Sequence, residues 1–308
     1  MIRGTMSIGT VQAFFQYVNQ AGEPLTQASF MINTLQSALA SAERTFELLD
    51  SEEEIPDPQN PKILEQAEGH IVFDHVSFGY EPSRLLMKDI SFSVRPGQKI
   101  AVVGSTGAGK TTLINLLMRF YEVNGGHILI DGIPSSAMSR KGLRQNFGMV
   151  LQDTWLFEGT IAENIAYGKP GASRDEIIAA AKAAQVDYFI RTMPHGYDTI
   201  VDSEGSNLSV GQRQLLTIAI VFLCNPPILI LDEATSSVDT RTETEINHAM
   251  EELMHGRTSF VIAHRLSTIR DADIILFMEN GNIIEQGNHQ NLLKKKGAYA
   301  SLYYSQFS

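Results

Sequence analysis

The chain has 308 residues, and its hydrophobic fraction of 43% excludes a disordered protein. A single cysteine excludes an intrachain disulfide framework. The net charge of −11, without any basic stripe, argues against a nucleic-acid partner. Much of that charge is local, because residues 47–68 include eight acidic residues and only one lysine. This acidic run is typical of a solvated connector.

The first predicted element is a long helical segment, from about Ser7 to Leu49, rich in Gln, Ala, Phe, Leu and Met. Pro24 is expected to end or kink this helix, which then continues from Leu25. No uninterrupted apolar run reaches 18 residues, so hydropathy alone does not predict a membrane-spanning helix. Residues 50–68 contain Pro56, Pro58 and Pro61 and are predicted to form an extended acidic linker.

Residues 69–308 alternate between strand and helix patterns, which predicts an α/β domain with an antiparallel β subdomain. The predicted strands cover 71–73, 90–94, 99–103, 127–130, 228–231, 259–263, 274–277 and 283–284. The predicted helices cover 109–119, 174–184, 210–223, 241–254 and a segment near the C-terminus. Capping-box spacing starts two of these helices, at Ser173 with Glu176 and at Thr240 with Glu243.

A phosphate-binding loop lies between the strand at 100–103 and the helix that follows it, which is the context this motif requires. Its glycines let backbone N–H groups turn around the phosphates, and the helix N-terminus favours an anion. Lys110 is expected to contact the β- and γ-phosphates, and the Thr111 hydroxyl is expected to bind Mg²⁺. The predicted nucleotide-binding residues here are Gly104, Ser105, Thr106, Gly107, Ala108, Gly109, Lys110, Thr111 and Thr112.

Two adjacent acidic residues, Asp232 and Glu233, follow the apolar strand at 228–231. Adjacent acids at a strand end are often only solvated, but here the phosphate-binding loop supplies a metal for them to face. We expect Asp232 to hold Mg²⁺ through water and Glu233 to act as general base on the attacking water.

The pentad Leu208-Ser209-Val210-Gly211-Gln212 differs by one residue from Leu-Ser-Gly-Gly-Gln, and it resembles the signature of ABC-type ATPases. With the phosphate-binding loop and the acidic pair, the chain is similar to the nucleotide-binding half of an ABC exporter of the multidrug or lipid type. The resemblance covers essentially the whole chain. It implies a parallel core sheet, an antiparallel β subdomain and an α-helical subdomain, with ATP and Mg²⁺ as ligands.

The resemblance also implies roles for residues outside the phosphate-binding loop. Tyr80, in Phe78-Gly79-Tyr80, is expected to stack on adenine. Gln152 matches the glutamine that senses Mg²⁺ and the attacking water, and His264 matches the histidine that contacts the γ-phosphate. The segment 159–164 resembles the exporter segment that faces the transmembrane coupling helices. Without the other motifs, Tyr80 and His264 would be read as packing or structural residues.

The pentad implies a second subunit, because in this family it caps the γ-phosphate bound by the opposite chain. Ser209, Gly211 and Gln212 are the expected contacts, and Asp239 matches the loop that crosses to the partner. Val210 departs from the family's glycine, and its β-branched side chain adds bulk near the phosphate. Residues 219–221 also depart, because exporters usually have an arginine there. Both departures affect the site that this chain completes for its partner, and Val210 favours a heterodimer over a homodimer.

The segment 1–49 resembles the end of an exporter's transmembrane domain, with its last membrane helix and a cytoplasmic extension. Periodicity alone leaves a soluble amphipathic helix open. The chain is expected to be a truncated ATP-hydrolysing exporter subunit at the cell membrane, with residues 69–308 on the cytoplasmic side and transmembrane domains as partners. The alternatives are a soluble ABC ATPase of repair or translation and a non-catalytic, ATP-dependent interaction module.

Overall fold

The structure is a computed structural model that describes residues 7–51, 53–81, 83–151, 154–202, 207–232, 238–263 and 266–307. The chain divides into two compact units, residues 1–56 and residues 57–308. The first unit is dominated by one helix, and the second contains the sheets and the hydrophobic core.

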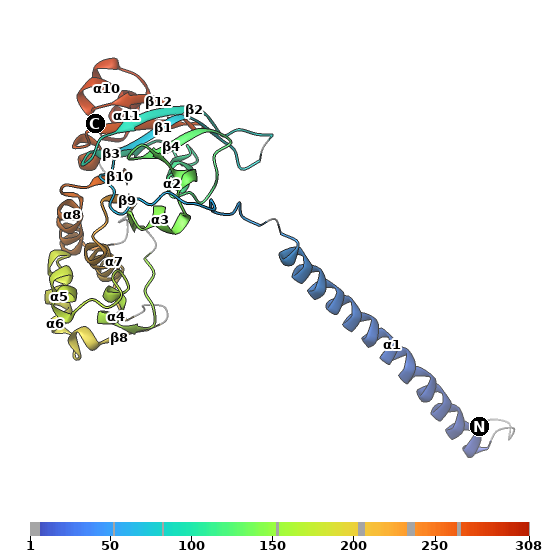
Figure 1. Cartoon of the computed structure of the whole chain (residues 1–308). Helices are drawn as coiled ribbons and strands as arrows, with labels where there is room; N and C mark the ends of the chain where they lie inside the picture. The colour runs from blue at the N-terminus through green and yellow to red at the C-terminus, as the bar shows by residue number, and fades with distance from the viewer. Residues whose placement is uncertain are drawn as a thin grey trace. The chain divides into compact units, whose positions relative to one another are not determined.

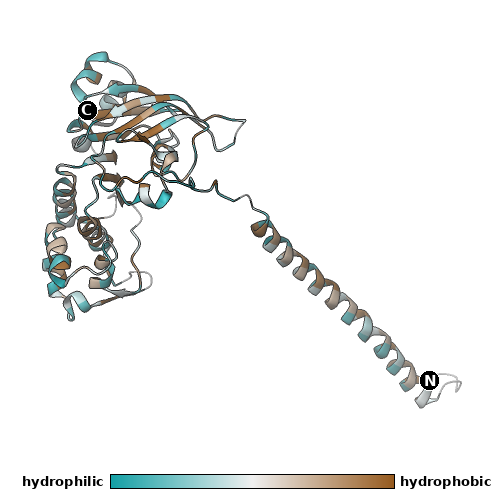
Figure 2. Ribbon diagram, in the orientation of Figure 1, coloured by the Kyte–Doolittle hydropathy of each residue, from teal (hydrophilic) through white to brown (hydrophobic). Residues whose placement is uncertain are grey.

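Helix α1 (Ile8–Leu49) is a single 42-residue element that begins where the Ser7 side chain accepts the N–H of Thr10. Of the two outcomes expected at Pro24, an end of the helix is wrong, because α1 (Figure 1) includes Pro24 in its interior. A proline removes one backbone hydrogen bond, but the bonded turns on both sides remain. None of the residues of α1 is buried, and Figure 2 shows apolar positions along its whole length.

In the second unit, the main sheet has six strands in the order β12-β11-β3-β10-β9-β6. Every neighbouring pair in it is parallel except β11 with β12, as expected for an α/β fold with an antiparallel edge strand. Its strands are β3 (Lys99–Val103), β6 (Phe147–Val150), β9 (Ile228–Asp232), β10 (Thr258–Ile262), β11 (Ile274–Glu279) and β12 (Asn282–Gly287).

A second, antiparallel sheet has the order β2-β1-β4-β5, and a short pair joins β7 to β8. These strands are β1 (Ile71–Phe78), β2 (Met87–Val94), β4 (Gly125–Ile130), β5 (Ile133–Pro134), β7 (Gly159–Thr160) and β8 (Ile200–Val201). All eight predicted strands are present, whereas β5, β6, β7 and β8 were not predicted. The predicted combination of parallel core sheet and antiparallel β subdomain is confirmed.

The core lies on both faces of the main sheet, because successive side chains of a strand point to opposite faces. On β3, Ala101 and Val103 belong to one hydrophobic cluster, and Ile100 and Val102 belong to the other. The first cluster also includes the helices that follow β6 and β9. The second includes the antiparallel sheet and α2. Both clusters therefore hold β3, and with it the start of the phosphate-binding loop.

The helices of this unit match four of the predicted internal helices and add several short ones. They are α2 (Lys110–Leu117), α3 (Arg140–Arg144), α4 (Ile161–Ala166), α5 (Arg174–Ala183), α6 (Asp187–Thr192), α7 (Val210–Cys224), α8 (Thr240–Met254), α9 (Leu266–Arg270), α10 (His289–Lys295) and α11 (Ala298–Phe307), with 3-10 turns η1 (Ser135–Ala137) and η2 (Gly196–Asp198). The capping box of Ser173 and Glu176 is confirmed. The one expected at Thr240 is wrong, because Asp239 caps α8 by accepting the N–H groups of Arg241 and Thr242.

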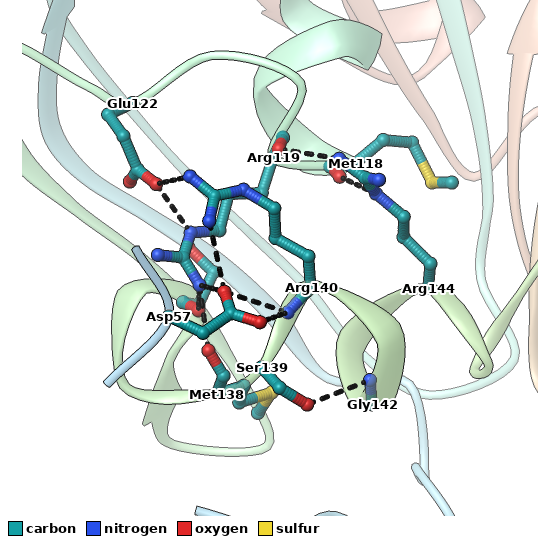
Figure 3. Close-up of polar contacts among 10 residues, drawn as sticks. Asp57, Met118, Arg119, Glu122, Met138, Ser139, Arg140, Gly142 and Arg144 are labelled. Carbon is teal, nitrogen blue, oxygen red and sulfur yellow. Dashed lines mark hydrogen bonds and ion pairs between the residues drawn. The ribbon is translucent and has the colours of Figure 1, made fainter. Parts of the chain in front are cut away.

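An ion-pair cluster holds the chain where it enters the second unit (Figure 3). Asp57 accepts two hydrogen bonds from the backbone N–H of Arg140 and pairs with its guanidinium at 3.0 Å. It also lies 3.6 Å from the guanidinium of Arg119, which is only 3% exposed and follows α2. Glu122 bridges the same two arginines at 2.7 and 2.9 Å. Asp57 is therefore a bound residue and an exception in the acidic run that the sequence predicts to be solvated.

Candidate functional site

The phosphate-binding loop connects β3 to α2, and close packing explains two of its glycines. A Cβ atom on Gly104 would lie 2.3 Å from the Met278 carbonyl oxygen, a distance that no side chain tolerates. Gly109 is the N-cap of α2 with a φ of 101°, a left-handed conformation that favours glycine. It offers no side chain to cap the helix, so the first N–H groups of α2 are left for an anion.

Lys110 points back over the loop that precedes it. Its Nζ donates to the carbonyl oxygens of Gly104, at 2.7 Å, and Ser105, at 3.0 Å. Partial burial lowers the pKa of Lys110, and the nearby Asp232 carboxylate opposes that shift. The ammonium group is therefore placed where a phosphate could replace loop carbonyls as its partner.

Lys110 and Asp232 line one cleft of about 420 Å³, a volume in the range of small-molecule sites. The structure therefore brings together the phosphate-binding loop and the acid at the end of β9, as the sequence predicts. The residues lining this cleft are Tyr80, Leu86, Thr106, Gly107, Gly109, Lys110, Thr111, Thr112, Asp232 and Ile262.

Tyr80, which the family resemblance predicts to stack on adenine, lines the same cleft as Lys110 and Asp232. Its hydroxyl lies 2.9 Å from the hydroxyl of Thr112, and its ring meets Tyr121 edge-on at 5.1 Å. The side chain is still 54% exposed. An aromatic ring that is held by its hydroxyl and is this exposed can stack on a base. A further groove beside it is lined by Tyr80, Glu81, Arg84, Leu85, Leu86, Gly107 and Asn280.

The signature pentad is built differently, and its residues do not line the cleft just described. Ser209 caps α7 by accepting the N–H of Gln212, and the Gln212 side chain accepts the N–H of Ser209. Val210 is 40% exposed. Gly211 is buried, and a Cβ there would lie 2.4 Å from the Thr242 side chain. The pentad thus presents Ser209 and Val210 to solvent and buries its glycine against α8.

Some predicted residues lie outside the described part of the chain, namely Gln152, Glu233 and His264. Asp239 is described and caps α8, and hydrogen bonds from Thr242 lower its pKa. Among the described residues, no group of three His, Cys, Asp or Glu side chains is arranged to hold a metal ion. Hydropathy likewise marks none of the described helices as long and apolar enough to cross a membrane.

Sequence reasoning missed one contact of the phosphate-binding loop. The Gly281 N–H donates to the Ala108 carbonyl oxygen at 3.0 Å, although the two residues lie far apart in the chain. The pair Asn280-Gly281 between two apolar strands was a visible hairpin signal. Nothing in the sequence, however, indicates which segment that turn touches.

A loop of this geometry, with an acid at the end of β9 two strands away in the same sheet, defines a P-loop nucleotide-binding domain. Comparison with known proteins identifies its kind, because residues 87–236 match the family described as ABC transporter. The chain therefore belongs to the ABC transporter family. The predicted recognition and fold class are confirmed at this level.

Two curated relatives illustrate the similarity. A fatty acid ABC transporter ATP-binding/permease protein of Mycobacterium bovis is 56% identical over 296 residues, covering 96% of this chain and 47% of the relative. An ATP-dependent lipid A-core flippase of Methylobacillus flagellatus is 48% identical over 306 residues, covering 99% of this chain and 52% of the relative. The chain thus spans about half the length of the curated relatives it matches.

A solved structure extends the similarity to three dimensions. A bacterial Atm1-family ABC exporter with ATP bound matches with a TM-score of 0.79 and 41% identity. The match covers 99% of this chain and 54% of that chain, so it includes α1 as well as the ATP-binding unit.

Proposed function

We propose that the chain is the ATP-hydrolysing part of an exporter, and that ATP binding and hydrolysis drive movement of membrane helices. The observation that carries this proposal is the single cleft in which Lys110, Thr111, Asp232 and Tyr80 meet. In this cleft Lys110 supplies a cation for phosphates, and Tyr80 supplies an aromatic ring for a base. The similarity to an Atm1-family exporter includes α1, which supports a membrane-domain segment on the same chain as this cleft.

The residues of the cleft fit Mg²⁺ as well as ATP. The Thr111 hydroxyl and the Asp232 carboxylate are hard oxygen donors, which Mg²⁺ prefers. When bound, Mg²⁺ neutralises charge that develops on the phosphates. Lys110 binds and orients the β- and γ-phosphates. Glu233 takes the proton of the attacking water, while Gln152 and His264 position the water and the γ-phosphate.

We infer that the γ-phosphate is enclosed by a second subunit, which contributes its own signature pentad. Ser209, Gly211, Gln212 and Asp239 of this chain would serve the partner's site in return. Val210 is exposed and β-branched at the first position of α7, where it narrows the approach of a phosphate. The pentad of this chain therefore encloses the partner's γ-phosphate less closely, and the native assembly is a heterodimer.

The membrane part of the proposal rests on α1. Polar residues recur along it at a spacing near 3.6 and form a stripe of Gln12, Gln16, Asn19, Glu23 and Thr26. Such a stripe would be costly against lipid, but it is tolerated where it faces a water-filled pathway. The names of relatives that act on fatty acids and lipid A-core favour an amphipathic, lipid-like or drug-like substrate. The ATP-binding unit then lies on the cytoplasmic side.

ATP turnover by the purified chain tests the catalytic assignment. Wild type should release phosphate in a Mg²⁺-dependent manner. Glu233→Gln should reduce the rate by about 10²-fold or more, because the general base is lost. Glu251→Gln, which removes an exposed carboxylate on α8, is the matched control and should keep the wild-type rate. Equal phosphate release by wild type and Glu233→Gln would overturn the assignment.

A further inference from the structure

Two hairpin turns of the second unit share one backbone conformation. Asn280 and Gly281 join β11 to β12 with φ angles of 49° and 80°. Asp131 and Gly132 join β4 to β5 with φ angles of 48° and 78°. Two positive φ angles in a two-residue loop are typical of the hairpin turn that favours Asn-Gly and Asp-Gly. An alanine at either glycine would therefore meet the same backbone penalty.

The two turns differ in what surrounds them. A Cβ on Gly132 would meet no atom within 4 Å. A Cβ on Gly281 would lie 2.1 Å from the Leu86 carbonyl oxygen and 2.9 Å from the Leu86 side chain. Gly281 is buried, whereas Gly132 is exposed. Gly281 is therefore a position of close approach, and Gly132 is a turn glycine only.

The neighbour that Gly281 approaches on its other side is the phosphate-binding loop. Its N–H donates to the Ala108 carbonyl oxygen at 3.0 Å. A Cβ on Gly109 would lie 3.2 Å from the Gly281 Cα, so the two backbones are in contact. Two residues before the turn, the contact between Met278 and Gly104 extends this packing to the start of the loop. The β11–β12 hairpin thus packs against the backbone of the phosphate-binding loop.

This support fixes the direction of one phosphate-binding group. In a trans peptide the carbonyl of one residue and the N–H of the next point to opposite sides. Because Gly281 holds the Ala108 carbonyl, the Gly109 N–H is turned away from the hairpin and towards the cleft. We propose that Gly281 is a positioning residue of the nucleotide site, which orients the Ala108–Gly109 peptide for the phosphates of a nucleoside triphosphate.

The same turn also lines a groove with Tyr80, the residue proposed to stack on the base. Asn280 lines the groove that also contains Tyr80 and Gly107. Asn282 ties the turn in place, because its side chain accepts the N–H of Lys88 at 3.0 Å and donates to the Asn280 carbonyl at 3.1 Å. The turn is therefore bound both to the loop that holds phosphates and to the strand that follows Tyr80. This inference rests on the proposed nucleotide site.

The test compares Gly281→Ala with Gly132→Ala in the full chain, by titration with a fluorescent N-methylanthraniloyl ATP and Mg²⁺. Gly281→Ala should weaken binding by about tenfold, the upper range for a lost hydrogen bond. Gly132→Ala pays the same backbone penalty without the contact and should stay within about twofold of wild type. Melting curves without nucleotide establish that both variants are folded. Equal dissociation constants for the two variants would overturn the proposal.

Asn282→Ala is a second variant that adds no atoms, so it can be tested even if Gly281→Ala does not fold. It frees the turn from Lys88, and we expect about two- to fivefold weaker binding, as for one neutral hydrogen bond. Unchanged binding by Asn282→Ala, together with a Gly281→Ala variant that is unfolded or binds normally, would reject the positioning role. If wild type itself fails to bind the nucleotide, the proposed function fails first, which is a distinguishable result.

Discussion

The phosphate-binding loop and the signature pentad both lead into a helix N-terminus, yet the two ends are finished in different ways. At α2 the N-cap is Gly109, which has no side chain to bond the first turn. At α7 the N-cap is Ser209, and its capping box with Gln212 satisfies both backbone donors locally. The N-terminus of α2 therefore has free N–H groups for an anion bound in the chain's own cleft. The N-terminus of α7 is self-satisfied and faces solvent.

The contrast between the N-termini of α2 and α7 agrees with the proposed roles of the two motifs, one in the chain's own site and one in the partner's. The P-loop is held from several sides by its own chain, through Gly281, Met278 and the two hydrophobic clusters. In the pentad, Leu208 is buried and Gly211 packs against Thr242, whereas Ser209 and Val210 are exposed. Under the proposed function, the chain carries one preorganised phosphate site and one exposed surface that would enclose the γ-phosphate of another subunit.

The largest expected effect is at Lys110. Lys110→Ala removes a charged donor from the N-terminus of α2. ATP turnover should fall by about 10²–10³-fold, as for loss of a preorganised donor. Phosphate release by purified protein measures this effect. Lys141→Ala, on the exposed side of α3, is the control and should turn over at the wild-type rate. A Lys110→Ala variant with unchanged turnover would place catalysis elsewhere.

The next effect concerns the far end of α2. Asp57→Asn keeps the shape of the side chain but removes the charge that pairs with Arg140 and Arg119. The free energy of unfolding should fall by about 1.5–3 kcal/mol, the range for hydrogen bonds to charged groups. Urea denaturation measures it. Asp271→Asn, which affects an exposed pair with Arg270, should change stability by less than about 1 kcal/mol. Equal effects would show that the cluster contributes nothing beyond a surface pair.

Ser209→Ala tests whether the N-terminus of α7, unlike that of α2, has no part in the chain's own nucleotide site. Loss of an N-cap should lower the free energy of unfolding by about 1 kcal/mol. Ser173→Ala, in the equivalent capping box of α5, should have a similar cost. Nucleotide affinity of the single chain should be the same for both variants and for wild type. A weaker affinity in Ser209→Ala alone would mean that the pentad contributes to the chain's own site.

The smallest effect is a pH dependence that distinguishes two capping boxes. The ion pair with Lys169 and the cap of Ser173 lower the pKa of Glu176 to about 2. Because the folded pKa lies below the usual 4.5, this contribution to stability is complete above that value and is lost as the pH falls towards 2. The melting temperature of wild type should exceed that of Glu176→Gln at pH 7, and the difference should shrink by pH 3. At α7 the neutral Gln212 should give no such dependence.

Sequence reasoning located the P-loop, the acid at Asp232 and the eight longer strands, because these depend on local patterns of glycine and apolar residues. It failed at Pro24, where a long helix retains its bonded turns on both sides of one broken position. It also placed the α8 cap one residue late, because both Asp239 and Thr240 are residue types that cap helices. The contact of Gly281 with Ala108 could not be predicted, since it depends on how two distant loops meet.

The most direct test of this division between subunits mixes two chains in one ATPase assay. Wild type supplies an intact P-loop, and the added chain carries Lys110→Ala, so that only its pentad can contribute. We expect the double variant Lys110→Ala/Val210→Gly to raise turnover per wild-type chain above that obtained with Lys110→Ala alone, because glycine removes the valine side chain near the phosphate. Turnover that is independent of the added chain would contradict this expectation.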